Sequence, residues 1–268
     1  MMSKDLNKDY WPIEQEAVLL IKTELSAFLQ KFKSKKLSFP GVKVGTPVTI
    51  SLQDTYFDTS SKELGNVQVA LRLRKEQGVL LLGIKGRDRW TISGVSRIEV
   101  EEPWSANGLA TILHYLDFIG ITLTHPGVPI GSSEPVIILG LTGLNPIQDR
   151  SLIRTLWPIL DTAEREVAFL ALDAVTLNLS NALVKYSEIE IELVDGPISL
   201  IKNLSDNLLY NHSDSLQPWP YSKLQTGIAI ESLSESLDAG NIVNENGELT
   251  LGGIGQVEQF LQKIASTN

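Results

Sequence analysis

The stretch SEIEIEL at residues 187–193 alternates carboxylates with isoleucine and leucine, and two earlier stretches repeat this alternation. They are LRLR at residues 71–74 and RIEVE at residues 97–101. Because successive side chains of a β-strand point to opposite faces, each stretch places its charges on one face and its aliphatic side chains on the other. The pattern predicts a β-sheet with one densely charged face.

Charges of both signs on several strands favour a sheet that closes around a charged guest. Like charges on neighbouring strands repel, so they gather only where a ligand needs them. Arginines bind phosphate oxygens and carboxylates bind hard divalent cations, so the expected guest is a polyanion together with a divalent cation. For any single stretch the alternative is a solvated strand with cross-strand salt bridges. The recurrence of the pattern favours the enclosed site.

Composition limits the class of protein. The chain has 268 residues, 43% of them hydrophobic, which suits one large domain. With 23 Lys and Arg against 32 Asp and Glu, its formal charge of -9 disfavours nucleic acid and anionic membranes as partners, so a bound polyanion needs a local basic pocket. The chain has no cysteine, which excludes disulfides, cysteine-ligated zinc and thiol nucleophiles.

No stretch of the sequence reads as a targeting or membrane segment. Residues 1–7 are polar, and the longest apolar run, around residues 135–141, is too short to span a bilayer. We therefore expect a cytoplasmic protein.

Periodicity predicts mainly strands, with helices near residues 21–32, 106–119 and 198–210. The expected strands cover residues 13–20, 48–59, 67–76, 79–85, 96–102, 150–157, 164–173, 174–179 and 184–194. Residues 120–145, rich in Gly and Pro, are predicted as a long connection without chemistry. Because closure removes sheet edges and creates a shared interior, the predicted fold is α+β: a closed antiparallel β-barrel, or tunnel, of about eight strands with helices packed outside.

The sequence predicts that the chain is divided into two parts. Residues 10–230 would form the tunnel domain, and residues 231–268 an acidic C-terminal extension, peripheral to it, with a last amphipathic piece near residues 257–264.

The order of the motifs resembles the CYTH family, the triphosphate tunnel metalloenzymes that include thiamine triphosphatases, inorganic triphosphatases and class IV adenylyl cyclases. The resemblance runs from about residue 13 to residue 227. It comprises EQE (14–16), DTYFDT (54–59), LRLR (71–74), GIKG (83–86), RIEVE (97–101), Arg154, ALD (171–173), SEIEIEL (187–193) and YSK (221–223). Each motif alone is weak, whereas their common order is strong support for the fold.

The resemblance implies a site. The basic residues that grip the triphosphate would be Arg72, Arg74, Lys85, Arg154 and Lys223. The carboxylates that bind the Mg²⁺ or Mn²⁺ cofactor would be Glu14, Glu16, Glu99, Glu101, Asp173, Glu188 and Glu190. The residue pattern independently supports part of this implied site. Arg72 and Arg74 are an i, i+2 pair and Lys85 lies on the next strand of a hairpin, so the three can converge on one phosphate chain.

One position departs from the family pattern. The opening motif of the family is ExExK, and Val18 stands where the lysine belongs. A charge-assisted hydrogen bond of this kind contributes about 1.5 to 3 kcal/mol. Lys22, four residues further on, keeps the same strand face only if the strand continues.

The implied function is a metal-dependent triphosphatase that hydrolyses a small-molecule triphosphate, inorganic or organic, such as thiamine triphosphate. A noncatalytic polyphosphate- or nucleotide-binding module is the alternative that Val18 raises, and an activity like that of class IV adenylyl cyclases is the alternative among enzymes. The sequence makes no prediction of the oligomeric state.

Overall fold

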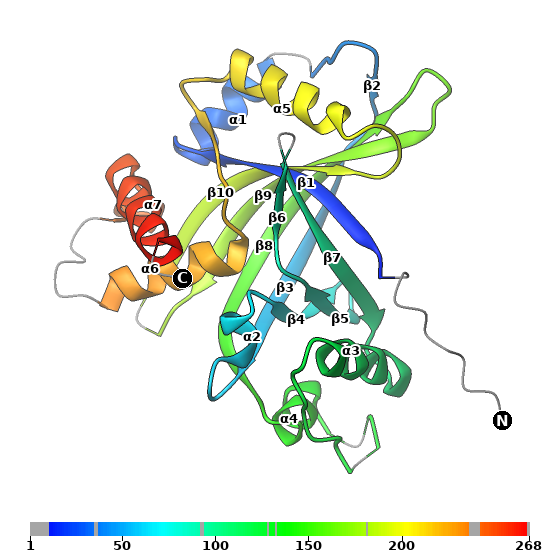
Figure 1. The fold of residues 1–268 in the computed structure, drawn as a ribbon. Coiled ribbons are helices and arrows are strands. Elements are labelled where there is room, and N and C mark those ends of the chain that lie inside the picture. Colours follow the sequence, from blue (N-terminus) through cyan, green and yellow to red (C-terminus); the bar gives the residue numbers. More distant parts are fainter. Residues whose placement is uncertain are drawn as a thin grey trace.

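Long antiparallel strands pair edge to edge into a closed ring in the computed structural model, which describes residues 11–34, 37–91, 94–127, 129–131, 133–180, 182–235 and 242–266 (Figure 1). The polar start at residues 1–7 lies outside the described residues. Within them the ring has eight strands, in the order β1 (Ile13–Ile21), β10 (Leu183–Leu193), β9 (Glu166–Asn178), β8 (Leu144–Leu160), β3 (Val48–Thr59), β4 (Ala70–Glu76), β5 (Val79–Lys85) and β7 (Gly94–Pro103). Strand β1 closes the ring because it pairs with both β10 and β7. The predicted fold class is confirmed.

A glycine permits the close approach at this seam. Gly94 begins β7 with φ +144°, and a Cβ there would overlap the carbonyl oxygen of Glu16 on β1. Any other residue would therefore push the two strands apart where Glu16 lies opposite Val95.

Helices cover the outward, aliphatic face of the ring in two groups (Figure 1). Helices α1 (Leu25–Ser34) and α5 (Ser199–Asn211) pack on β1, β9 and β10, where Phe28, Ile189 and Leu204 are fully buried. Helix α3 (Ala106–Phe118) lies over β5 and β7 and helix α4 (Pro135–Leu141) lies against β8, with Leu71 and Leu116 in the core cluster beneath them. The remaining short elements are α2 (Glu63–Asn66), β2 (Lys43–Val44), β6 (Arg89–Thr91) and β11 (Leu216–Pro218). Among the described residues, no helix has the length and apolar character needed to cross a membrane.

Helices α6 (Lys223–Glu235) and α7 (Leu251–Ala265) have a different role, because they cover an apolar part of the barrel interior. Leu52 shares a strand face with the buried Asp54, and it packs in one core cluster with Ile230 of α6 and Val257 of α7. Gly227 lets α6 approach β8, since a Cβ there would overlap the side chain of Gln148.

Three local predictions differ from the structure. Residues 164–173 and 174–179, predicted as two strands, fall mostly in the single strand β9, because its backbone pairs with both β8 and β10 across the predicted break at residues 173 and 174. The connection at residues 120–145 contains α4. The segment after residue 230 is not peripheral: α6 runs across residue 230 and α7 buries Ile254, Val257 and Leu261. The division of domains at residue 230 stays a prediction.

Candidate active site

The inward face of the ring lines one cavity of about 620 Å³, which we call the charged tunnel. The predicted site residues that line it are Glu14, Glu16, Arg72, Arg74, Lys85, Glu99, Glu101, Arg154, Glu188, Glu190 and Lys223. Asp173, the twelfth predicted residue, is fully buried behind them and pairs with Arg154 and Lys223. The structure thus brings the whole predicted set together, as the alternation of charged and aliphatic residues requires.

One end of the network is built around Asp54, whose role sequence reasoning missed. Arg74 donates two hydrogen bonds to Asp54, Nε to Oδ1 at 2.7 Å and Nη2 to Oδ2 at 2.8 Å. Arg72 lies beside the same carboxylate and donates from Nη2 to Glu101 Oε2 at 2.8 Å. Burial opposes ionisation of Asp54, but Arg72 and Arg74 together hold its pKa well below the usual range. The signal was present in the sequence, since residues 54–59 belong to the quoted motifs.

The seam between β1 and β7 is held by Arg97, a second residue to which the sequence assigned no role. Arg97 Nε donates to Glu14 Oε2 at 2.9 Å and its Nη2 donates to Glu16 Oε1 at 2.5 Å. Lys85 Nζ reaches Glu14 Oε2 at 2.9 Å and Glu99 Oε2 at 3.0 Å. Arg97 is two residues before Glu99 on β7, so strand alternation alone places it on the charged face.

The carboxylates of β9 and β10 surround the ammonium of Lys223, the first residue of α6. Lys223 Nζ contacts Asp173 Oδ2 at 2.9 Å and donates to Glu188 Oε1 and Glu190 Oε1. Arg154 donates to Asp173 through Nε at 2.7 Å and through Nη2 at 2.6 Å, and its Nη2 also reaches Glu190 Oε2 at 2.5 Å. These contacts link β8, β9, β10 and α6 through charge.

Protonation differs between neighbouring carboxylates of β10. Burial raises the pKa of Glu188 to about 7, with Glu190 adding to the shift and Lys223 opposing it. Burial acts on Glu190 too, yet Lys223 and Arg154 outweigh it and hold the pKa of Glu190 well below its usual range. Glu192 lies at the wall of the tunnel, where burial and the charge of Glu14 raise its pKa to about 7. Environments that separate the pKa values of adjacent carboxyl groups are typical of functional sites.

Several buried polar atoms near the tunnel have no hydrogen-bond partner among the described residues. Arg150 is 1% exposed, and its three side-chain nitrogens belong to this set, as does Glu188 Oε2. The guanidinium of Arg150 lies 4.2 Å from the centre of the Tyr56 ring, a cation–π contact. Buried donors and acceptors of this kind normally meet water, an ion or a ligand. Sequence reasoning placed Arg150 at the start of a strand and assigned it no chemistry.

The position that the resemblance gives to the family's motif lysine carries an uncharged side chain in the tunnel wall. Val18 lines the tunnel on the face of Glu14 and Glu16, opposite Glu190 in the register of β1 and β10. Lys22 does not replace the lysine, because β1 ends at Ile21 and Lys22 Nζ donates to the carbonyl of Ser213, away from the tunnel residues.

Comparison with known proteins supports the family seen in the motifs. The family model described as the CYTH domain matches residues 21–218. The search of curated proteins gave no match.

Solved structures resemble the chain at low sequence identity. A candidate adenylyl cyclase from Hippeastrum, described as revealing a dominant triphosphatase activity, is 19% identical with a TM-score of 0.49, over 81% of this chain and 95% of that one. A candidate adenylate cyclase from Bacillus halodurans is 17% identical with a TM-score of 0.45, over 80% and 97%. The PH1819 protein from Pyrococcus horikoshii is 15% identical with a TM-score of 0.46, over 78% and 96%.

Proposed function

Since this chain belongs to the CYTH domain family, we propose that it is a divalent-metal-dependent triphosphatase that binds a small-molecule triphosphate in the charged tunnel and hydrolyses a phosphoanhydride bond. The observation that carries the proposal is the meeting of Arg and Lys side chains with carboxylates from distant strands around one cavity of about 620 Å³. In this proposal Arg72, Arg74, Lys85, Arg154 and Lys223 bind the phosphate oxygens.

The donor set of β9 and β10 fits a hard divalent cation. Asp173, Glu188 and Glu190 each offer an oxygen, and these atoms all lie within 4.8 Å of one another. Glu188 also has the buried Oε2 without a partner among the described residues. Carboxylate oxygens are the ligands preferred by Mg²⁺ and Mn²⁺. We propose these three residues as principal ligands, with Glu14, Glu16, Glu99 and Glu101 as further carboxylates of the metal-binding wall.

The charge balance of the tunnel supports a metal requirement. Among the described residues that line it, the carboxylates outnumber the basic side chains. A polyanion that entered alone would add negative charge to this excess, which repulsion in a low-dielectric cavity disfavours. A bound divalent cation would neutralise part of this charge and polarise the phosphoryl group that is cleaved.

The side chains of the chain would supply positioning and electrostatic stabilisation. Lys223 lies among the same carboxylates that would hold the metal. We propose that its ammonium moves from them to the phosphate oxygens when substrate and metal bind. Arg154, which donates two hydrogen bonds to Asp173 and one to Glu190, would turn to the phosphates in the same way. Fixed cations aimed at the charge of a transferring phosphoryl group account for most catalysis in such reactions.

The test is phosphate release from tripolyphosphate with Mg²⁺ or Mn²⁺ and with a chelator. We expect metal-dependent release that falls by at least about 100-fold in Arg154→Ala, the cost of losing one charged stabilising contact. Arg165→Ala is the matched control, because Arg165 is 73% exposed and pairs only at the surface with Asp161 among the described residues. Circular dichroism verifies that both variants fold.

The alternatives give different results in the same experiment. Tight binding of tripolyphosphate in a calorimeter without phosphate release would support the noncatalytic binding module. Formation of cyclic AMP and pyrophosphate from ATP would support the cyclase. Failure to bind or cleave any triphosphate would contradict the proposed function.

A further inference from the structure

One part of the tunnel wall is apolar. Beside the charged network the cavity is bordered by Ile50 of β3, Leu156 of β8, Phe169 of β9, Ile228 of α6, and Leu261 and Ile264 of α7, a set we call the apolar lip. The triphosphate chain and the metal ion of the proposed function do not account for it, because both are bound by charged and polar groups.

The apolar lip begins directly next to the phosphate-binding cations. Leu156 follows Arg154 by two positions on β8, so both side chains point to the same face. Ile50 lies opposite Arg154 in the register of β3 and β8, and Phe169 lies opposite Glu192 in the register of β9 and β10. A ligand whose phosphate chain lies in the charged tunnel and that carries one further group therefore places that group against the apolar lip.

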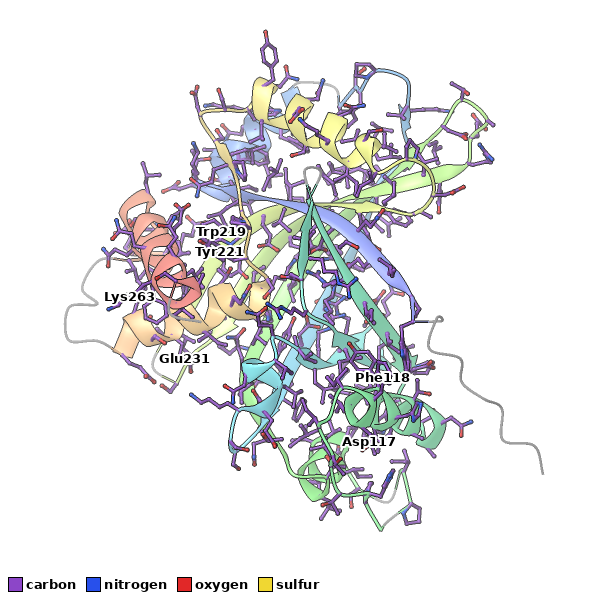
Figure 2. The ribbon with its side chains drawn as sticks, viewed as in Figure 1. Asp117, Phe118, Trp219, Tyr221, Glu231 and Lys263 are labelled. Atoms are coloured by element: carbon purple, nitrogen blue, oxygen red, sulfur yellow. The ribbon has the colours of Figure 1, made fainter. Side chains whose placement is uncertain are left out.

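Two helices that follow the family match at residues 21–218 form the outer half of the lip. Ile228 of α6 lies four residues after Leu224, which also lines the cavity, and Leu261 and Ile264 are three apart on α7, so each pair shares a helix face. The two helices pack together around Trp219, because Ile230 of α6 and Val257 of α7 lie in one core cluster with it, and Trp219 Nε1 donates to Thr226 Oγ1 of α6 at 2.9 Å. Figure 2 shows Trp219 and Tyr221 beside α7.

The lip remains open to solvent in spite of its composition. Ile228 is 40% exposed and Ile264 is 42% exposed. Exposed aliphatic side chains at the border of a cavity indicate a surface that a ligand covers. The cavity volume of about 620 Å³ also lies within the range of pockets that hold organic ligands, about 300–1,000 Å³.

We propose that the substrate is an organic triphosphate monoester whose apolar or aromatic group packs on the apolar lip, while its triphosphate lies among the cations of the tunnel. This inference rests on the proposed function and narrows it, because inorganic triphosphate leaves the lip uncovered. Phe169 and Tyr221, which both line the cavity, supply aromatic surface for the organic group.

The first experiment compares ligands of equal charge. Dissociation constants are measured by calorimetry for the non-hydrolysable β,γ-imido forms of phenyl triphosphate and methyl triphosphate. We expect the phenyl ester to bind at least about 10-fold more tightly, the scale on which an apolar pocket separates ligands that differ by small apolar groups.

The second experiment locates the effect. The ratio of the two dissociation constants is measured in Ile228→Ser and Ile264→Ser, and we expect each substitution to reduce the preference for the phenyl ester severalfold. Ile137→Ser is the control, because Ile137 is an exposed isoleucine of α4, 57% accessible, outside the lining of the cavity. Its ratio should equal that of the unchanged protein.

The outcomes distinguish failure of this inference from failure of the proposed triphosphatase function. Equal binding of both esters, or a preference that Ile228→Ser and Ile264→Ser leave intact, overturns the inference while the triphosphatase proposal stands. Binding of neither ester, together with no cleavage of tripolyphosphate, overturns both.

Discussion

Asp54 and Arg74 show how single residues hold charge inside this protein. Two parallel hydrogen bonds join them, and both side chains are nearly inaccessible to water. A buried ion pair of this geometry adds little net stability, but removing one partner leaves the other charge uncompensated, which costs about 3–5 kcal/mol.

Replacing Asp54 changes the response of stability to acid. The pKa of Asp54 is held below its usual value of 3.8 by Arg72 and Arg74 against the effect of burial. Its contribution is therefore complete above pH 3.8 and is lost as pH falls below that value. We expect Asp54→Asn to lower the free energy of unfolding at neutral pH and to flatten its decline in acid, as measured by urea unfolding across pH. The surface substitution Asp206→Asn is the control, and an equally steep decline in both variants would contradict the prediction.

Adding the motif lysine tests the departure from the family pattern. In Val18→Lys a cation would enter the tunnel opposite Glu190. If it contacts phosphate with the usual strength of a charge-assisted hydrogen bond, the KM for tripolyphosphate should fall by about 10-fold or more. Val79→Lys adds the same charge at an exposed position of β5 and should leave KM unchanged. Identical KM values in the two variants would show that position 18 does not meet the substrate.

The strand face on which a charged side chain lies could be predicted from the sequence, whereas the side chains that it contacts could not. Strand alternation placed Arg72, Arg74 and Glu190 on the inner face. It could not show that Arg97 bridges Glu14 and Glu16, because that contact depends on the register of β1 against β7, some eighty residues away. Arg150 was missed for a related reason: it stands in no alternating charged stretch and its neighbour Tyr56 comes from another strand.

At the scale of elements, helix α7 is part of the barrel structure. Its sequence predicted an amphipathic piece, but the acidic, polar segment before it gave no indication of what its apolar face would cover. The structure supplies the missing partner, because Ile254, Val257 and Leu261 pack in the same core cluster as Leu52 and Leu152 of the barrel. The apolar interior that α7 covers forms only when the ring closes.

The contribution of α7 to folding is measurable. We expect Ile254→Ala to lower the free energy of unfolding by about 2–5 kcal/mol, the usual cost of truncating a buried isoleucine. Leu251→Ala on the same helix is the control, since Leu251 is 67% exposed, and it should change stability by less than about 0.5 kcal/mol. Equal effects in chemical denaturation would show that α7 unfolds independently of the barrel.

At the scale of the whole molecule, the proposed metal binding at the excess carboxylates would raise the stability of the folded protein. A cation that binds only the folded protein stabilises it by about 2.7 kcal/mol when its concentration is 100 times its Kd. We expect Mg²⁺ or Mn²⁺ to raise the thermal midpoint, and Glu190→Gln to diminish this rise because Glu190 is one of the three clustered ligands. Glu164→Gln, at an exposed ion pair with Lys43, should retain it. The thermal midpoint is measured by differential scanning fluorimetry. An equal rise in both variants would show that the cation binds elsewhere.

The ring is completed by β1, which comes first among the described strands, and its two neighbours β7 and β10 follow much later in the chain. Until residue 193 has been synthesised, β1 lacks the complete β10 as a partner, so the ring stays open and its inner charges stay hydrated. Pairing across such long separations is slow because the intervening chain must lose its entropy first. Closure of the ring is then also the step that removes water from the inner charges and assembles the charged tunnel, so a chain whose ring is still open has no such tunnel.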